Sequence, residues 1–159
     1  MNSQPSSVAD LKGSCLCGAS TYTISDPTPL YSVICHCIAC QQWSGSVFAA
    51  NIGFALSAFH VDEKSWESIK IHDDTGPQSG RTLHRHFCGK CGSCLFVTSA
   101  SMPGFVSVMR GCLEGNVNEV GELSRKEFDP KNEFFCERRV DWVQVEGIVD
   151  SRKRMDKEQ

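Results

Sequence analysis

Short runs rich in β-branched and aromatic residues recur along the chain, and none of them sustains the 3.6-residue period of a long helix. Segments built from Asp, Pro, Gly and Asn separate the runs, as at residues 26–29, 73–77, 102–104 and 114–116. This alternation is typical of β-strands joined by turns. It predicts a mainly β domain with strands at residues 19–24, 30–34, 47–52, 66–71, 81–87, 95–98, 105–109 and 134–143.

Two segments between the predicted strands fit a short helix as well as a loop, namely residues 54–66 and 121–131. We place a single domain at residues 11–146, with terminal extensions at residues 1–10 and 147–159. A chain of 159 residues is long enough for one domain to bury roughly two-thirds of the surface that its unfolded form exposes. The fold therefore does not depend on metal ions to compensate for a very small core.

Cysteine is the unusual feature of an otherwise average composition, in which 40% of the residues are hydrophobic and 22% are charged. The chain has ten cysteines, yet its first ten residues lack the basic start and apolar stretch of a secretion signal. No window reaches the 18 or so apolar residues of a membrane span. We therefore expect a soluble cytoplasmic protein, in which thiols stay reduced and cysteine clusters bind metal.

The net charge of −3 bears on the partners of the protein. A protein that binds nucleic acid draws its affinity from neutralising phosphates, and it carries a strong basic bias that this chain lacks. We expect small-molecule partners, with neither nucleic acid nor membrane among them.

The cysteines with metal-ligand spacing form three clusters: Cys15 with Cys17, Cys35 with Cys37 and Cys40, and Cys88 with Cys91. A Cys-x-x-Cys turn brings two sulfurs to one ion. A disulfide within a Cys-x-Cys pair would be strained, but the two sulfurs can share a metal. The first and third clusters together supply four sulfurs, which complete a tetrahedral site. We expect that site to be structural.

The middle cluster, Cys35, Cys37 and Cys40, supplies only three sulfurs. One tetrahedral position then stays open for water, a thiol or a carbonyl oxygen, which is what a catalytic metal requires. Three thiolates make zinc a weak Lewis acid, so binding and acidifying a soft thiol suits this site better than activating water. If Cys94 or Cys112 closed the site instead, its ion would be structural.

Four motifs give the chain a resemblance to a known family: residues 13–18 (GSCLCG), 35–46 (CHCIACQQWSGS), 85–92 (RHFCGKCG) and 139–142 (RVDW). With them the sequence resembles the glutathione-dependent formaldehyde-activating enzyme family, also called GFA-like, which includes centromere protein V. The chain departs from the usual family pattern at Cys94, where a small residue without a thiol is more typical.

The resemblance implies a β-tent fold with two zinc ions per chain. It implies a structural zinc on Cys15, Cys17, Cys88 and Cys91, and a catalytic zinc on Cys35, Cys37 and Cys40. It further implies a carbon–sulfur lyase that condenses formaldehyde with glutathione to S-(hydroxymethyl)glutathione. Family membership alone does not fix a substrate.

Two other functions fit the same sequence. One is a GFA-like lyase or isomerase that acts on another small carbonyl metabolite in secondary metabolism. The other is a non-catalytic zinc module that binds protein partners, with both of its metal ions fully coordinated. The sequence assigns no proton-transfer residue to the formaldehyde-condensing lyase or to this alternative enzyme.

Several further residues have both a functional and an ordinary structural interpretation. We expect Cys94, Cys112 and Cys136 to be small buried hydrophobic residues. His36 is expected to point away from the metal, in an outer-shell or surface position, and His84 and His86 to be structural rather than acid–base groups. Arg81, Arg85, Arg110 and Lys90 are candidates for binding a carboxylate, or ordinary solvated charges. Trp43, Trp66 and Trp142 are candidate pocket walls, or core residues.

Overall fold

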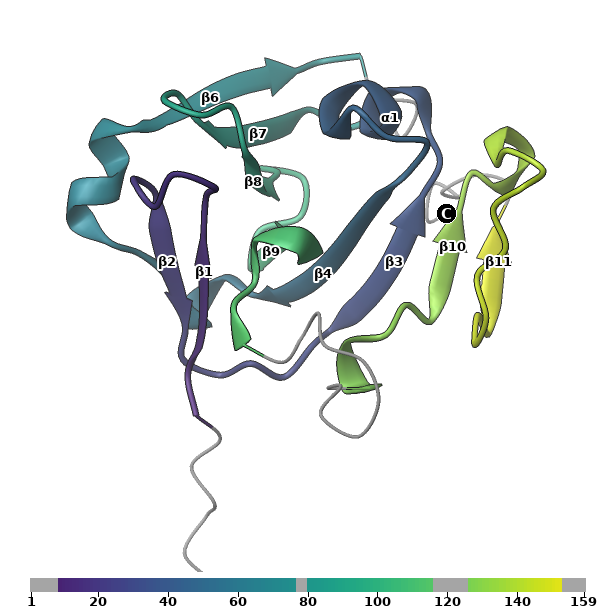
Figure 1. The fold of residues 1–159 in the computed structure, drawn as a ribbon, viewed down its shortest axis with the longest axis horizontal. Coiled ribbons are helices and arrows are strands. Elements are labelled where there is room, and N and C mark those ends of the chain that lie inside the picture. The colour runs from purple at the N-terminus through teal and green to yellow at the C-terminus, as the bar shows by residue number, and fades with distance from the viewer. Residues whose placement is uncertain (1–8, 77–79, 116–125, 153–159) are drawn as a thin grey trace, which may run out of the picture.

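The computed structural model describes residues 9–76, 80–115 and 126–152, and in these ranges the chain is mainly β, as predicted. It forms a three-stranded and an eight-stranded sheet with one α-helix, α1 (Ile38–Ser44). Figure 1 shows β1 and β2 on one side, with the larger sheet curving behind and around them. No helix of these ranges is long and apolar enough to span a membrane.

The smaller sheet has the antiparallel order β1-β2-β5, and the larger has the order β11-β10-β3-β4-β9-β8-β7-β6. The strands are β1 (Leu11–Ser14), β2 (Thr21–Ile24), β3 (Tyr31–Cys35), β4 (Ala49–Ala55), β5 (Phe59–Val61), β6 (Ile69–Asp74), β7 (Leu83–Cys88), β8 (Cys94–Thr98), β9 (Phe105–Met109), β10 (Asn132–Phe134) and β11 (Asp150–Arg152). Short 3₁₀ helices connect them: η1 (Leu56–Ala58), η2 (Glu63–Glu67), η3 (Arg110–Cys112), η6 (Lys126–Phe128) and η7 (Cys136–Arg138).

Aromatic side chains join the two sheets in the core. The Phe59 ring lies 5.0 Å from the Tyr22 ring and 4.7 Å from the Phe96 ring, measured between centroids, so both sheets contribute to one aromatic cluster. Gly13 makes room for it, because a Cβ there would lie 2.2 Å from the Tyr22 ring. Burying each such ring stabilises the fold by roughly 1.5–3 kcal/mol.

Most of the predicted strands are confirmed, and one is wrong in most of its length. Of residues 134–143 only Phe134 is in a strand, because Phe135 adopts a left-handed backbone and η7 follows it. The prediction at residues 66–71 starts too early, since Trp66 lies in η2. The ambiguous residues 54–66 hold the end of β4, η1, β5 and most of η2.

The sequence patterns missed α1 and the strands β1, β5 and β11. Of the second ambiguous segment, residues 121–125 lie outside the described ranges, and η6 follows them. Residues 1–8 and 153–159 of the expected terminal extensions also lie outside these ranges.

Candidate metal centre

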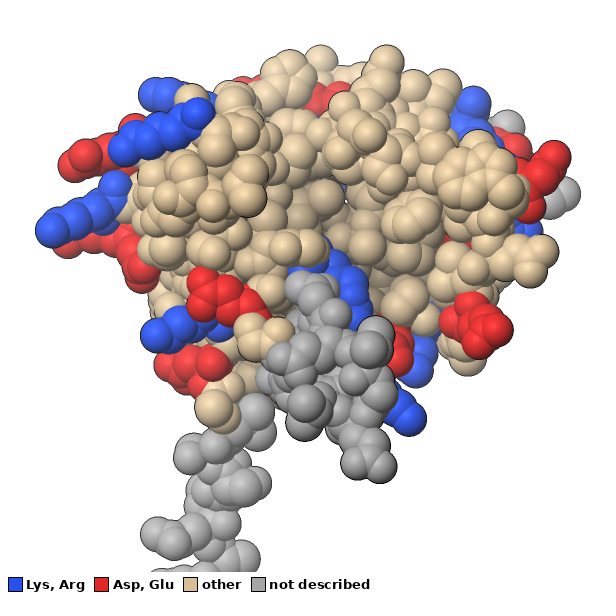
Figure 2. All heavy atoms as spheres, viewed as in Figure 1, with Lys and Arg blue, Asp and Glu red and all other residues tan. Residues whose placement is uncertain are grey.

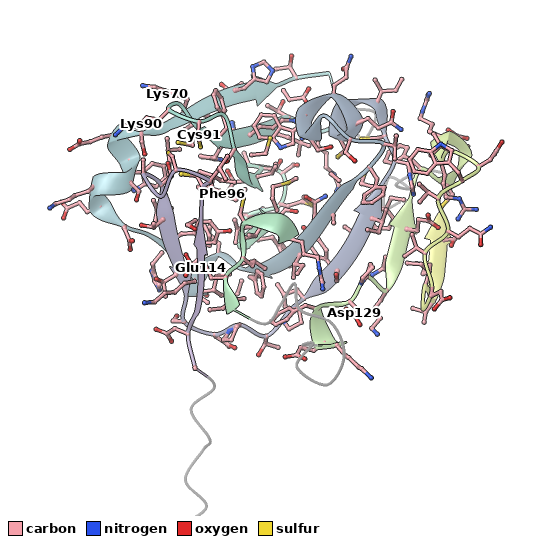
Figure 3. The ribbon with its side chains drawn as sticks, in the orientation of Figure 1. Lys70, Lys90, Cys91, Phe96, Glu114 and Asp129 are labelled. Atoms are coloured by element: carbon pink, nitrogen blue, oxygen red, sulfur yellow. The ribbon has the colours of Figure 1, made fainter. Side chains whose placement is uncertain are left out.

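Two groups of cysteines come together in the folded chain, and they are the two groups that the spacing predicted. In the first group, the sulfurs of Cys15, Cys17, Cys88 and Cys91 all lie within 4.8 Å of one another. Figure 3 shows Cys91 beside the upper ends of β1 and β2, so the turn after β7 meets the turn after β1. Segments far apart in the sequence therefore converge at this four-cysteine group.

The distances in this group fit a metal ion. The Cys17 sulfur lies 3.6 Å from the Cys15 sulfur and 3.8 Å from the Cys88 sulfur. A tetrahedral zinc ion, with bonds of about 2.3 Å to sulfur, separates its ligand atoms by about 3.8 Å. All ten cysteines of the chain are free thiols, so no disulfide competes for these sulfurs.

Glycine and serine shape the two cysteine turns. Gly18 and Gly92, each following a cysteine of the group, have left-handed φ angles of 74° and 77°, which residues with a Cβ rarely adopt. The Ser20 amide donates a hydrogen bond to the Cys15 sulfur at 3.3 Å. The hydrogen bond from the Ser93 hydroxyl is the largest cause that lowers the pKa of Cys91 to about 5. The local structure thus favours a thiolate at Cys91.

The second group is Cys35, Cys37 and Cys40, whose sulfurs also lie within 4.8 Å of one another. Cys35 ends β3, Cys37 is the N-cap of α1, and Cys40 lies in its first turn, where the Cys40 amide donates to the Cys37 sulfur at 3.3 Å. Cys35 and Cys37 are buried and Cys40 is partly exposed. In the described ranges, no further His, Cys, Asp or Glu joins this three-cysteine group.

Hydrogen bonds within the three-cysteine group favour ionisation of Cys37. The pKa of Cys37 is lowered to about 3 because its thiolate accepts hydrogen bonds from the thiols of Cys35 and Cys40, with a further contribution from the Arg85 charge. The pKa of Cys35 is raised, first by its hydrogen bond to Cys37 and also by burial. A soft, anionic donor set of this kind suits zinc.

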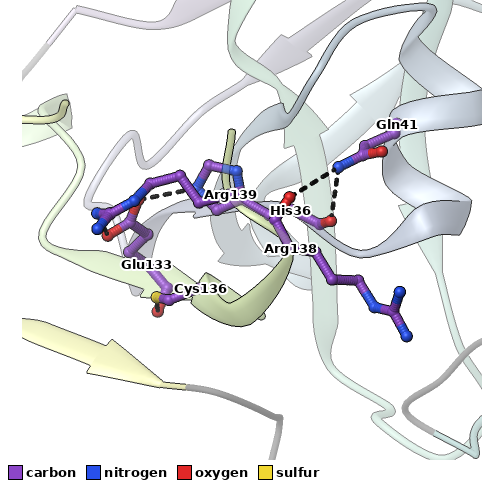
Figure 4. Close-up of polar contacts among 6 residues, drawn as sticks. All are labelled: His36, Gln41, Glu133, Cys136, Arg138 and Arg139. Carbon is purple, nitrogen blue, oxygen red and sulfur yellow. Dashed lines mark hydrogen bonds and ion pairs between the residues drawn. The ribbon is translucent and has the colours of Figure 1, made fainter. Parts of the chain in front are cut away.

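The segment after β10 packs against this three-cysteine group, a contact that the sequence did not predict. Phe135 packs against Cys35 and Cys37, and it is the one residue other than glycine with a positive φ, 57°, in the described part of the chain. Figure 4 shows Glu133 next to His36, whose Nε2 lies 2.8 Å from a Glu133 oxygen. His36 is fully buried, so the surface position that the sequence left open for it is wrong.

Comparison with known proteins supports the family resemblance that the motifs indicate. A family model described as "Glutathione-dependent formaldehyde-activating enzyme" matches residues 10–138. The chain belongs to this family. The resemblance that the cysteine motifs predicted is thereby confirmed.

Two relatives illustrate how far the family similarity extends. A Halomonas elongata protein named "Putative glutathione-dependent formaldehyde-activating enzyme" is 26% identical over 143 residues, which is 89% of this chain and 85% of that protein. The crystal structure of a Rhodobacter sphaeroides protein has a similar fold, with a TM-score of 0.50 and 20% identity, covering 70% of this chain and 91% of that one.

The remaining cysteines of this GFA family member lie outside both groups. Cys94 donates its thiol hydrogen to the Trp43 carbonyl at 3.0 Å, and Cys112 donates to the Cys94 carbonyl at 3.0 Å. Cys136 points to the Glu133 carbonyl at 3.4 Å. All three are partly exposed, so the prediction that they are buried was too strong. Neither Cys94 nor Cys112 completes the three-cysteine group.

The four basic candidates are Arg81, Arg85, Arg110 and Lys90, and Arg85 alone among them is buried. Its Nε donates to an Asp74 carboxylate oxygen at 2.8 Å, and its guanidinium carbon lies 5.5 Å from the centre of the Trp43 ring. Trp43 is in α1 one turn after Cys40, so the Arg85 charge lies close to the three-cysteine group. In Figure 2 most Lys and Arg side chains on the face in view lie toward its edges.

The histidine and tryptophan candidates have structural roles or are exposed. His84 Nδ1 lies 2.7 Å from an Asp73 oxygen, and the His86 ring stacks on Phe96 with a centroid distance of 4.3 Å. Trp66 and Trp142 are exposed to 50% and 74%, so a core position is wrong for both. None of these side chains belongs to either cysteine group.

Proposed function

We propose that this GFA family member is a zinc-dependent carbon–sulfur lyase that joins a thiol, with glutathione as the natural candidate, to formaldehyde or a related small aldehyde. The observation that carries the proposal is the three-cysteine group, which has no fourth His, Cys, Asp or Glu donor in the described ranges. The family match and the name of the Halomonas elongata relative support the choice of substrates.

Each cysteine group has its own part in this proposal. The four-cysteine group would hold a structural ion, because four thiolates saturate tetrahedral zinc. Cys35, Cys37 and Cys40 would hold the catalytic ion, which would lower the pKa of a thiol substrate at the position that the three cysteines leave free. The sulfurs of each group lie within 4.8 Å of one another in the folded chain.

The reaction is an addition without oxidation or reduction. The thiol sulfur forms a bond to the carbonyl carbon, the π electrons of the carbonyl move to its oxygen, and the thiol proton ends on that oxygen. Phe135 and the buried Cys35 and Cys37 close one side of the site to water, which leaves the partly exposed Cys40 side for the substrates. Arg85 contributes positive charge, which favours the anionic form of an incoming thiol.

The proposal is tested by the rate of adduct formation from glutathione and formaldehyde, since these also combine without a catalyst. Wild-type protein loaded with zinc is expected to exceed the buffer rate at matched pH, whereas Cys40→Ser is expected to fall to background. Cys94→Ser is the matched control, because Cys94 lies outside both groups and serine can keep its hydrogen bond to Trp43. A wild-type rate equal to that of buffer would remove this substrate assignment.

A further inference from the structure

The segment after β10 is fixed to the metal-binding loop by backbone pairing. Strand β10 runs parallel to β3 and places Phe134 opposite Cys35. Beyond the end of β3, the His36 amide donates to the Phe134 carbonyl at 3.0 Å. The backbone that carries Cys35 and Cys37 is therefore held from the side by a segment about a hundred residues further along the chain.

A buried carboxylate, that of Glu133, contacts His36 in the loop that carries Cys35 and Cys37. Glu133 is 1% exposed, and its carboxylate contacts His36 Nε2 at 2.8 Å and Arg139 Nη1 at 3.0 and 3.3 Å (Figure 4). A buried carboxylate is costly unless it is paired in this way. Burial alone would raise the pKa of Glu133, but the His36 hydrogen bond and the Arg139 charge lower it below its ordinary value. Glu133 is therefore a charged partner that holds the His36 ring in one orientation.

A reversal of the chain brings Arg139 back to Glu133. Phe135 makes this turn with a left-handed backbone, an unfavourable conformation for a bulky side chain that persists only where the surroundings enforce it. The Phe135 ring packs against Cys35 and Cys37. On the other side of the loop, Gln41 Nε2 donates to the His36 carbonyl at 2.9 Å and the Arg138 carbonyl at 3.4 Å. We call residues 133–139 the C-terminal clasp.

We propose that Glu133 and Arg139 are positioning residues, which fix His36 and thereby the sulfurs of Cys35 and Cys37 in the arrangement that leaves the fourth position open. The inference deepens the proposed function and rests on the three-cysteine group as its metal site. The surroundings of the four-cysteine group are different: its sulfurs have hydrogen bonds with Ser20, Ser93 and the backbone amides of Lys90 and Cys91, none of which is part of the clasp. A change in the clasp should therefore affect one metal site and leave the other intact.

The test compares Glu133→Gln with Glu146→Gln, the same substitution at an exposed position. Apo protein is titrated with cobalt(II) against a competing chelator, and the thiolate charge-transfer absorption is followed. In Glu133→Gln we expect the affinity of the three-cysteine site to fall 10- to 100-fold, the range found when groups that orient metal ligands are removed. The affinity of the four-cysteine site and the far-ultraviolet circular dichroism should match those of the wild type and of Glu146→Gln.

Arg139→Gln provides a second variant in case Glu133→Gln does not fold, since the Arg139 side chain is 41% exposed. It should weaken the same site by a smaller factor. Wild-type affinity at both sites in both variants would overturn the inference, and so would equal losses at the two sites. The cobalt affinity tests the clasp, whereas the response of the wild type to added thiol tests the proposed function, so each can fail without the other.

Discussion

Single glycines permit the turns of the four-cysteine group, and Gly92 offers a clean test of this. Its φ angle is 77°, and a Cβ added there would meet no atom within 4 Å. Gly92→Ala should therefore lower the free energy of unfolding by about 1–2 kcal/mol through backbone strain alone. Gly111 is the control, because a Cβ there also meets nothing and its φ is not positive. If urea unfolding of the zinc-loaded variants gave the same loss for both, the turn would not depend on glycine.

His86 gives the fold a pH dependence with a definite sign. Burial lowers the pKa of His86 below its ordinary value, so between that lowered pKa and about 6.5 the unfolded chain binds the proton more readily. Stability is then fully present above this window and is lost as the pH falls through it. Replacing His86 by Phe, which can keep the stacking on Phe96, should flatten the pH dependence of the unfolding free energy measured from pH 7.5 to 5.5. His72→Phe, on the exposed part of β6, should leave the dependence as it is.

The residues of the site differ in how far the sequence reveals them. The cysteines of both groups could be predicted because metal ligands recur at fixed spacings along the chain. Glu133 could not, since it meets His36 across 97 positions. Arg85 was a candidate for binding a carboxylate, but its place beside the three-cysteine group could not be predicted, because it reaches Trp43 only after β7 packs near α1. Contacts of that kind leave no local pattern.

At the scale of elements, α1 combines a helix cap with a proposed metal ligand. The Cys37 sulfur accepts a hydrogen bond from the Cys40 amide, and Gly45 ends the helix in the left-handed conformation with φ 64°. Serine is a good N-cap but lacks the soft sulfur. Cys37→Ser should therefore keep the far-ultraviolet circular dichroism of the wild type while zinc, measured by elemental analysis, falls from two ions per chain to one. Retention of both ions would show that Cys37 is not a ligand.

The elements were predictable where their signals are local. Strands such as β8 and β9 are rich in β-branched and aromatic residues, and the sequence predicts them closely. β5 is three residues long, and α1 is only seven residues long, too short for a periodic pattern. The expected strand at residues 134–143 fails because packing against the cysteines forces Phe135 out of the extended conformation, which overrides its β propensity.

At the scale of the molecule, the four-cysteine group joins parts of the chain that are distant in sequence. Cys17 and Cys88, 71 positions apart, link the small sheet to β7, whereas Cys35, Cys37 and Cys40 are neighbours along the chain. A link that closes a long loop stabilises more than one within a short segment. Cys17→Ser should lower the free energy of unfolding by about 2–4 kcal/mol more than Cys40→Ser does, measured in urea with zinc present. Equal losses would contradict the structural assignment of the four-cysteine group.

The central claim is that the three-cysteine group holds a metal ion with one open coordination position. The most direct measurement is a glutathione titration of the cobalt(II)-substituted protein, followed by visible absorption, with Cys40→Ser measured in parallel. The account predicts a saturable, thiol-dependent change in the cobalt bands of the wild type that is absent in Cys40→Ser. Bands that stay unchanged in the wild type at saturating glutathione would contradict it.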